Sequence, residues 1–305
     1  MGVILGGQAQ CPAMPSLTRR QLLVLVLLTL VWGLNWPVMK VGVTGFPPLT
    51  FRTLSMWLGL PVLALALRAL GVPFEVPRRY WWPLLGLGFV NMVMWHGLII
   101  VAIPHLSSGR AAILGYTMPV FSAVLGALCF GERLAPRAWA GVTAAACGVL
   151  LLLWHELGTL GGRPVGVSLM LIAAGSWALG TQLLRRSAIP LPTLTLAFWM
   201  TVQTAVIMTL LSLGLERAQW HWPAPATQYA IVFNALLVFG FAQSAWFTLV
   251  RGLPPVAATL SVMMIPVLGV FSGAWWLGEH LHWQDAAAVG LMVVAIASVL
   301  WPRRS

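Results

Sequence analysis

Charge is what this sequence has least of. Asp, Glu, Lys and Arg together make up only 8% of the 305 residues, whereas hydrophobic residues make up 60% and the mean hydropathy is +0.90. A soluble domain contains about 25% charged residues overall, most of them on its water-facing surface. So low a charged fraction excludes a water-soluble globular protein and predicts a protein that lies in a lipid bilayer.

Acidic residues and cysteines are the scarcest reactive groups. The chain has six Asp and Glu residues and three cysteines, Cys11, Cys129 and Cys147, whose spacing matches no metal motif. We therefore expect no metal and no cofactor. The net charge of +11 does not indicate a nucleic-acid partner, because the basic residues are spread thinly between apolar runs. No Gly-Lys-Ser/Thr phosphate loop is present, so ATP-driven transport is unsupported.

Long apolar runs fill most of the chain. A spanning helix needs about 20 mostly apolar residues, and helices are the default in lipid because every backbone group must be paired. The period-2 alternation of a membrane barrel is absent. No apolar stretch precedes a cleavage site in the first twenty residues, so we expect no cleaved signal peptide. The predicted spans are 21–41, 47–67, 82–104, 107–130, 136–154, 165–184, 193–213, 227–250, 255–277 and 283–301.

The placement of Lys and Arg predicts the orientation of these ten helices. An even number of spans puts both termini on one side, and positive residues concentrate on the cytoplasmic side. With both termini inside, the cytoplasmic positions are Arg19, Arg20, Arg68, Arg78, Arg79, Arg133, Arg137, Arg185, Arg186, Arg251, Arg303 and Arg304. The opposite side keeps Lys40, Arg52, Arg110, Arg163 and Arg217. Twelve positive residues on the side of the termini, against five on the opposite side, predict cytoplasmic termini. We expect the membrane to be a bacterial-type inner membrane.

The two halves of the chain resemble each other. Pro119, Gly131 and Glu132 recur 147 positions later as Pro266, Gly278 and Glu279, and Trp32 and Lys40 are matched 145 positions later by Trp177 and Arg185. Each half holds five predicted helices, an odd number, so the second half must enter the membrane from the other side. We predict an all-α membrane protein of two inverted-topology five-helix repeats, 21–154 and 165–301, with cytoplasmic tails 1–20 and 302–305.

The segment Trp32-Gly33-Leu34-Asn35-Trp36-Pro37-Val38-Met39-Lys40 resembles the first-helix signature of EamA-type transporters, in the drug/metabolite transporter superfamily. The Gly-Glu pairs that follow the fourth and ninth helices are similar to the end of each family repeat. The resemblance covers about residues 22–301. It implies export or exchange of small metabolites without ATP, often amino acids, including aromatic ones. The second copy, Ser176-Trp177-Ala178-Leu179-Gly180-Thr181, lacks the Asn, so only the first copy is expected to bind ligand in the family's way.

Polar residues deep in the membrane are the best candidates for a substrate site. His96 lies near the middle of the third predicted helix, and Gln243 occupies the equivalent position in the eighth. On inverted helices these two would converge near the midplane, where such transporters bind substrate. The alternative is an interhelical hydrogen bond worth about 1 kcal/mol. No acidic residue lies deep in a predicted helix; at the place where small multidrug-resistance relatives carry Glu, this chain has Asn35.

Further candidates carry an alternative structural role. Trp32, Trp95, Trp177 and Trp246 could stack on apolar substrate groups or simply pack. Lys40 could attract a substrate carboxylate or extend to the headgroups, and Arg110 could act as a gate, an anion contact or an interfacial anchor. Pro119 and Pro266 could be hinges for alternating access or static bends.

We therefore expect a secondary transporter, not an enzyme, that exports small metabolites, most of all neutral or aromatic amino acids, by alternating access. Facilitated movement down a gradient is favoured, because His96 is the only plausible proton-carrying group at the midplane. The alternatives are a proton-coupled drug or metabolite exporter and an integral-membrane enzyme for lipid-like substrates. The expected partners are the substrate and the bilayer; the oligomeric state is open.

Overall fold

The computed structural model describes residues 18–132, 136–158, 164–249 and 255–300. Most of the predicted tail 1–20 and all of the tail 302–305 lie outside these residues. The described residues form helices and connecting turns, with no β-strand among them. The all-helical fold expected from the composition is therefore confirmed for this part of the chain.

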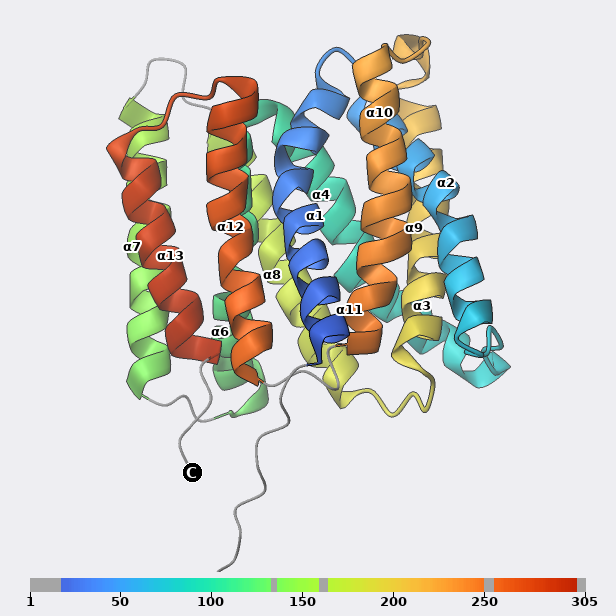
Figure 1. Cartoon of the computed structure of the whole chain (residues 1–305). Helices are drawn as coiled ribbons and strands as arrows, with labels where there is room; N and C mark the ends of the chain where they lie inside the picture. The colour runs from blue at the N-terminus through green and yellow to red at the C-terminus, as the bar shows by residue number, and fades with distance from the viewer. Residues whose placement is uncertain (1–17, 133–135, 159–163, 250–254, 301–305) are drawn as a thin grey trace, which may run out of the picture.

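The first half contains α1, α2 and a run of shorter helices that leads to α7 (Figure 1). Their bounds are α1 Arg19–Val43, α2 Pro48–Ala69, η1 Arg78–Tyr80, α3 Trp81–Gly88, η2 Phe89–Val93, α4 Met94–Ala102, η3 Ile103–His105, α5 Ser108–Gly115, α6 Met118–Phe130 and α7 Pro136–Gly158. The elements from α3 to η3 form one continuous rod, so the predicted span 82–104 is a single helical segment with a π-helical middle.

The second half repeats this order. Its elements are α8 Pro164–Arg186, α9 Thr193–Leu215, η4 Arg217–Gln219, α10 Pro225–Phe233, η5 Asn234–Ala242, α11 Gln243–Leu249, α12 Pro255–Leu277 and α13 Trp283–Leu300. Again a π-helical segment, η5, lies in the middle of the third rod of the half. π-helical turns inside α-helices occur frequently at functional sites.

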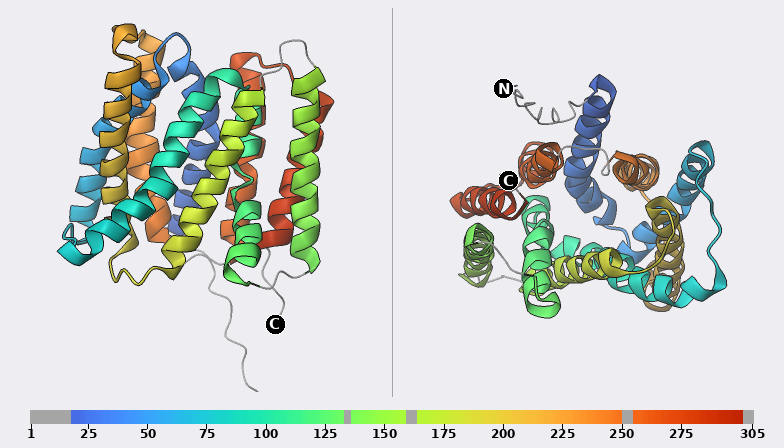
Figure 2. Two further views of the ribbon diagram at one scale, coloured as in Figure 1. Left: turned by 180° about the vertical axis from the view of Figure 1, so that it is seen from behind. Right: turned by 90° about the horizontal axis from the view of Figure 1, so that it is seen from below.

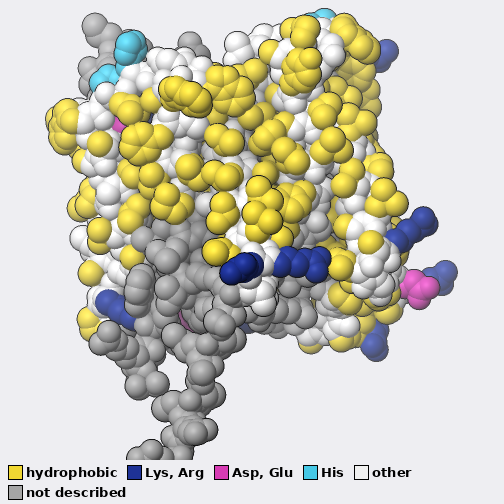
Figure 3. Space-filling model, in the orientation of Figure 1, with side chains coloured by type: hydrophobic (Ala, Val, Ile, Leu, Met, Phe, Trp, Pro, Cys, Tyr) yellow, Lys and Arg dark blue, Asp and Glu magenta, His cyan; other side chains and the backbone are white. Residues whose placement is uncertain are grey.

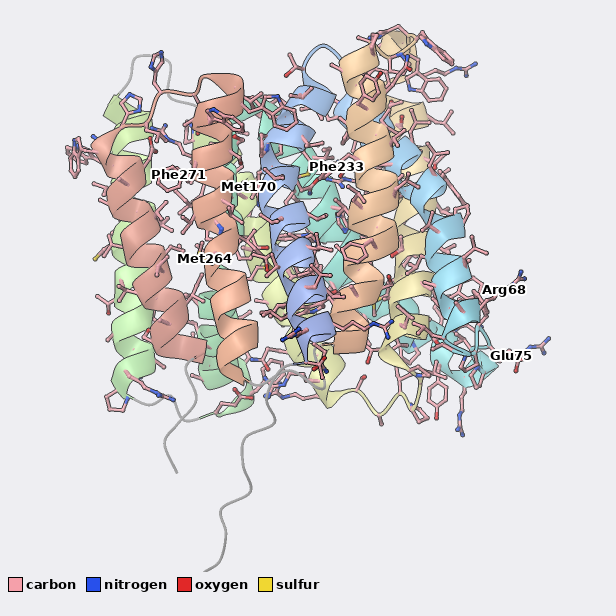
Figure 4. All side chains as sticks on the ribbon, viewed as in Figure 1. Arg68, Glu75, Met170, Phe233, Met264 and Phe271 are labelled. Atoms are coloured by element: carbon pink, nitrogen blue, oxygen red, sulfur yellow. The ribbon has the colours of Figure 1, made fainter. Side chains whose placement is uncertain are left out.

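The chain is a multi-pass membrane protein. Among the described residues, seven helical segments are long and apolar enough to cross a bilayer, and two shorter apolar helices, Met264–Leu277 and Trp283–Ser298, accompany them. On the face drawn in Figure 3, most of the described surface is hydrophobic side chains. Core and lipid-facing positions contrast sharply: Met170 of α8 is fully buried, whereas Phe271 of α12 is 63% exposed; both are labelled in Figure 4. An apolar exterior of this kind is what a lipid solvent stabilises.

Glycine and proline set the ends and breaks of the helices. Gly131 ends α6 with a left-handed φ of 67°, and Gly278, its counterpart after α12, has a φ of 64°. This conformation is accessible to glycine without steric strain, which explains the glycine of both Gly-Glu pairs. The predicted helix 107–130 is interrupted at Tyr116–Thr117, so Pro119 stands in the first turn of α6 and not in mid-helix. Pro266 does lie inside the continuous helix α12.

The helices form a bundle in which each half packs on the other. Helix α1 contacts α12 and the rod α10–η5–α11, while α8 contacts α5, α6 and the rod α3–η2–α4. Helix α2 packs on α9, and α7 packs on α13 as a pair at one edge of the bundle, seen from below in Figure 2. Helix α1 begins and α13 ends at the lower end of the bundle in Figure 1.

Candidate functional site

A cavity of about 750 Å³ lies between the two halves. Its lining comes from α1, α2, α6, α7, α8, α9 and the two π-helical rods. It includes all seven residues predicted to bind substrate: Trp32, Asn35, Trp95, His96, Trp177, Gln243 and Trp246. A cavity of this size with mostly apolar walls and a few polar groups is typical of small-molecule sites. The structure therefore brings the predicted residues together, and their role in binding is taken up below.

Two pairs of tryptophans line this cavity, each joining one residue from either half. The rings of Trp32 and Trp246 are 5.5 Å apart at an interplanar angle of 56°. Those of Trp95 and Trp177 are 5.2 Å apart at 53°. These tilted arrangements lie in the range favoured by the ring quadrupoles. Because each pair bridges the halves, a relative motion of the halves would change the shape of the apolar walls.

His96 and Gln243 face the cavity from the two π-helical rods. The His96 ring lies 5.4 Å from the ring of Phe239 in η5, and the Gln243 amide donates to Thr201 Oγ1 at 3.3 Å. A direct hydrogen bond between His96 and Gln243 is not among the contacts of the described residues. Both residues line the cavity, and Gln243 also makes an interhelical hydrogen bond, from α11 to α9.

Arg52 is the deepest charge in the cavity. Its side chain comes from α2, is only 1% exposed, and lies over the Phe239 ring at 5.6 Å. Nη2 contacts the Met39 sulfur at 2.9 Å and Nη1 donates to Asn234 Oδ1 at 3.4 Å. No carboxylate in the described part of the chain pairs with it. A buried cation without a counter-ion is costly, so this arrangement marks a place where an anionic group would be stabilised.

We take the exposed charged part of the lining as the mouth of the cavity; it lies where α6 and α8 end, at the lower end of the bundle, whereas Arg52 is in the second turn of α2, which begins at the upper end (Figure 1). Glu132 and Arg185 line it there, and the Arg185 side chain is 62% exposed. Glu132 pairs with Arg186 at 2.5 Å and with Arg185 at 3.7 Å, and Arg186 also lies over the Phe130 ring. The cavity lining thus includes exposed charges at the lower end of the bundle as well as the buried Arg52, which is 1% exposed.

Interhelical hydrogen bonds hold the upper end of the bundle together. Lys40 Nζ donates to the carbonyl oxygens of Ile103, Pro104 and Leu106 at 3.0, 3.0 and 2.8 Å. These carbonyls lie at the end of the third rod, where backbone carbonyls run out of helical partners, so the ammonium caps that helix end; the Ile103 oxygen also accepts from the Leu106 N–H at 3.3 Å. Lys40 does not line the cavity. Its ammonium is bound by three backbone carbonyls of this protein, which is neither a contact with a substrate carboxylate nor one with lipid headgroups.

Two acidic residues cap helices on the same end. Glu216 accepts from the backbone N–H groups of Leu49 and Thr50, at 2.9 and 2.7 Å, at the start of α2. Glu279 accepts from the Ser108 N–H at 2.7 Å and the Ser108 hydroxyl at 2.8 Å, at the start of α5. Carboxylates at helix N-termini satisfy unpaired N–H groups and complement the helix dipole. Both contacts join the two halves.

Arg110, the second charged residue singled out from the sequence, also lies outside the cavity lining. Its Nε donates to Asp285 Oδ1 at 2.8 Å, with both side chains almost fully buried. Asp285 in turn accepts from the His282 N–H at 3.0 Å. The geometry therefore holds Arg110 in an ion pair between α5 and α13.

The two matched prolines occupy unequal positions. Pro119 lines the cavity just after the break between α5 and α6, whereas Pro266 is buried within α12 and is not part of the lining. At the break, the Thr117 hydroxyl donates to the Leu114 carbonyl at 2.6 Å. A hinge role stays a prediction for both; only the first proline adjoins a real interruption of the helix.

Arg52 is the residue that the sequence interpretation missed. It was counted among the charges of the outer side, because it stands only five residues after Pro47. The available signal was an arginine inside an otherwise apolar span, which is expensive in a membrane unless it has a function. Among the described residues, no group of three or more His, Cys, Asp or Glu is arranged to hold a metal.

The fold and the cavity define a class, namely multi-pass membrane proteins with a central cavity between two similar halves. A family model described as "EamA-like transporter family" matches the chain twice, at residues 19–154 and 164–301. The chain belongs to this family. The resemblance inferred from the first-helix signature is confirmed, and the family is one of transporters.

Curated relatives agree with this assignment. The chain is 29% identical to the inner membrane transporter YedA of Escherichia coli K12 over 278 residues, which cover 89% of this chain and 88% of the relative. It is 27% identical to the transporter YoaV of Bacillus subtilis, over 84% and 87% of the two chains. A relative in Escherichia coli K12 named "Probable amino-acid metabolite efflux pump" is 27% identical, over 87% and 89%. A solved crystal structure, 22% identical, has the same fold with a TM-score of 0.66, covering 92% of this chain and 96% of the other.

Proposed function

We propose that this protein is a secondary transporter that exports small metabolites, most of all neutral and aromatic amino acids, by alternating access and without ATP. The observation that carries the proposal is the cavity, which is lined by tryptophan pairs from both halves and leads from an exposed mouth to the buried Arg52. A site between two similar halves is the geometry that rocking of the halves can expose to either side.

The proposed topology is ten spans in two inverted halves. The packing supports it, because exchange of the halves reproduces the contacts: α1 on the rod α10–η5–α11 corresponds to α8 on the rod α3–η2–α4. Two further contacts, α2 with α9 and α7 with α13, correspond to themselves. Helix α1 also starts at the lower end of the bundle, where α8 finishes (Figures 1 and 2). An odd number of spans in each half produces this inversion.

We place the lower end of the bundle in the cytoplasm of a bacterial-type inner membrane. On the face drawn in Figure 3, Lys and Arg side chains gather toward the lower end, and Figure 4 places Arg68 there. This distribution follows the positive-inside rule. With this orientation the mouth of the cavity opens to the cytoplasm, which is the side from which an exporter takes up its substrate.

The substrate class rests on the cavity walls and on one relative. Tryptophan faces are suited to apolar and aromatic side chains. The relative named as a probable amino-acid metabolite efflux pump belongs to the same set of similar proteins. We therefore propose amino acids with neutral or aromatic side chains. Glu132 is the only acidic residue that lines the cavity within the described residues, and it lies at the mouth, so a facilitator is favoured over a proton pump.

A flux assay tests this proposal. Purified full-length protein in liposomes is expected to equilibrate labelled phenylalanine, leucine or a related neutral amino acid across the bilayer without ATP. Protein-free liposomes are the background, and uptake should stop when inside and outside concentrations are equal. An absence of flux across a broad panel of amino acids and related metabolites would refute the amino-acid assignment.

The alternative, proton-coupled export, has one specific observation in its favour: His96 is an ionisable group that lines the cavity. We predict that His96→Gln alters the KM for the amino acid, because the ring lies in the cavity beside Phe239. An imposed pH gradient separates the mechanisms. Accumulation above equilibrium in the wild type, lost in the variant, would establish coupling, whereas unchanged KM and flux would assign His96 a structural role.

A further inference from the structure

Two buried polar atoms of opposite kind line the cavity without a hydrogen-bond partner. Within the described residues, such unpaired atoms are found on Asn35, Arg52, Thr53, Gln203 and Gln284. Only Asn35 and Arg52 belong to the cavity lining. The unpaired atom of Asn35 is the acceptor Oδ1, and that of Arg52 is the donor Nε. Buried unpaired groups are rare in folded proteins, so two in one cavity call for a functional explanation.

The guanidinium of Arg52 has only weak partners. Nη1 reaches Asn234 Oδ1 at 3.4 Å, at the long limit of a hydrogen bond, and Nη2 contacts the Met39 sulfur, a weak acceptor. The planar fork of arginine suits a carboxylate, which accepts two parallel hydrogen bonds. A ligand carboxylate would therefore supply both the missing acceptor and the missing negative charge.

Asn35 lies close enough to act together with Arg52. It stands four residues before Met39 on α1, and Met39 touches the Arg52 guanidinium. Four residues are about one helical turn, a rise of roughly 6 Å. The carbonyl oxygen of Asn35 accepts a hydrogen bond and can bind an ammonium group. An acceptor and a cation within about one turn match the ammonium and the carboxylate of a single α-amino acid.

We propose that Arg52 and Asn35 are the anchor of the substrate site, with Arg52 binding the α-carboxylate and Asn35 the α-ammonium of a zwitterionic amino acid. This inference rests on the proposed function and deepens it. The side chain of the substrate then lies against the tryptophan pairs, so the anchor selects the backbone groups and the aromatic walls select the side chain. Organic cations are disfavoured, because nothing in the described cavity neutralises Arg52.

The test compares three probes with the same aromatic ring: phenylalanine, phenethylamine, which lacks the carboxylate, and 3-phenylpropanoate, which lacks the amine. Their transport is measured with the full-length protein in liposomes. The wild type is expected to prefer phenylalanine over both analogues. In Arg52→Gln the KM for phenylalanine should rise roughly tenfold to a hundredfold, as expected when a hydrogen bond to a charged group is lost. The preference over phenethylamine should fall in parallel.

Matched variants separate binding from folding. Arg68→Gln makes the same change on the same helix at an exposed position, and it should leave the preference unchanged. Asn35→Ala should raise the KM for phenylalanine more than the KM for 3-phenylpropanoate. The ratio between probes does not depend on how much protein is folded, so a partly unfolded Arg52→Gln sample still reports selectivity. If that variant yields no folded protein, Arg52→Lys is used instead. Lysine keeps the positive charge but lacks the planar guanidinium, so the preference for phenylalanine over phenethylamine should fall by a smaller factor.

The possible failures are distinguishable. A wild type that carries phenylalanine, with an unchanged preference in both Arg52 variants and in Asn35→Ala, would overturn the anchor and leave the proposed function intact. A wild type that carries phenethylamine as well as phenylalanine would also overturn it. A wild type that carries none of the three probes, nor any other amino acid, would overturn the proposed function and the anchor with it.

Discussion

Glu279 and Glu132 occupy equivalent positions in the two halves, yet their carboxylates have different partners. Glu279 accepts from the N–H and the hydroxyl of Ser108, at 2.7 and 2.8 Å, and from the Gly109 N–H at 3.4 Å. Glu132 pairs with Arg186 at the open mouth, where the two side chains are 35% and 33% exposed. We predict that Glu279→Ala destabilises the protein far more than Glu132→Ala does.

The magnitude follows from these contacts. Hydrogen bonds to a charged group contribute about 1.5–3 kcal/mol each, and the loss here is discounted because Glu279 is partly exposed, which leaves about 3 kcal/mol. An exposed ion pair such as that of Glu132 contributes about 1 kcal/mol or less. At roughly 2 °C per kcal/mol for a chain of this size, Glu279→Ala should lower Tm by about 6 °C and Glu132→Ala by about 2 °C or less.

The assay is thermal unfolding of the purified full-length variants in one detergent, followed by tryptophan fluorescence. Glu279→Gln is the conservative control; it keeps an acceptor without the charge and should lie between the wild type and Glu279→Ala. Ser108→Ala removes only the hydroxyl and should give a smaller loss than Glu279→Ala. Equal drops in Tm for Glu279→Ala and Glu132→Ala would refute the reasoning. They would mean that the glutamate of either Gly-Glu pair contributes equally, whether or not it caps a helix.

Two further predictions concern buried contacts. Arg110→Met should lower the free energy of unfolding by about 3–5 kcal/mol, because Asp285 is left buried without its ion-pair partner. The double variant Arg110→Met/Asp285→Leu should recover part of this loss. A double variant as unstable as the sum of the two single changes would contradict the prediction. Gly115→Ala should lower the free energy of unfolding by about 1–3 kcal/mol, since a Cβ there would overlap the Trp36 ring. Gly175→Ala is the control: there is open space around its Cβ position, so this variant should be neutral or stabilising. Equal unfolding temperatures for the two variants would contradict the packing at Gly115.

The helical spans could be predicted from the sequence because lipid leaves the chain few choices. A run of about 20 apolar residues must form a helix, and the boundaries then follow from Gly, Pro and Arg. The predicted span 193–213 lies within α9 (Thr193–Leu215), and the predicted span 165–184 within α8 (Pro164–Arg186). The π-helical segments and the break at Tyr116–Thr117 have no comparable signal, since they depend on packing between distant helices.

The candidate site could be predicted only in part. Deep polar residues and tryptophans are visible in the sequence, and the structure places the predicted set around one cavity. Partners distant in the chain are not visible: Lys40 binds carbonyls of residues 103, 104 and 106, and Arg110 binds Asp285. Arg52 was assigned to the outer side because its depth depends on Met39 and Phe239 packing over it.

The polar contacts that join the halves differ between the two ends of the bundle. Glu279 caps α5 through the N–H of Ser108, but the counterpart of Ser108 in the second half is Pro255, which has no N–H to offer Glu132. If the halves exchange conformations, closure of the lower end cannot form the same cap. The state with a closed upper end therefore has a hydrogen bond that its mirror state lacks. In the mechanism proposed here, a substrate bound at Arg52 shifts this equilibrium toward the mirror state only if it binds that state more tightly.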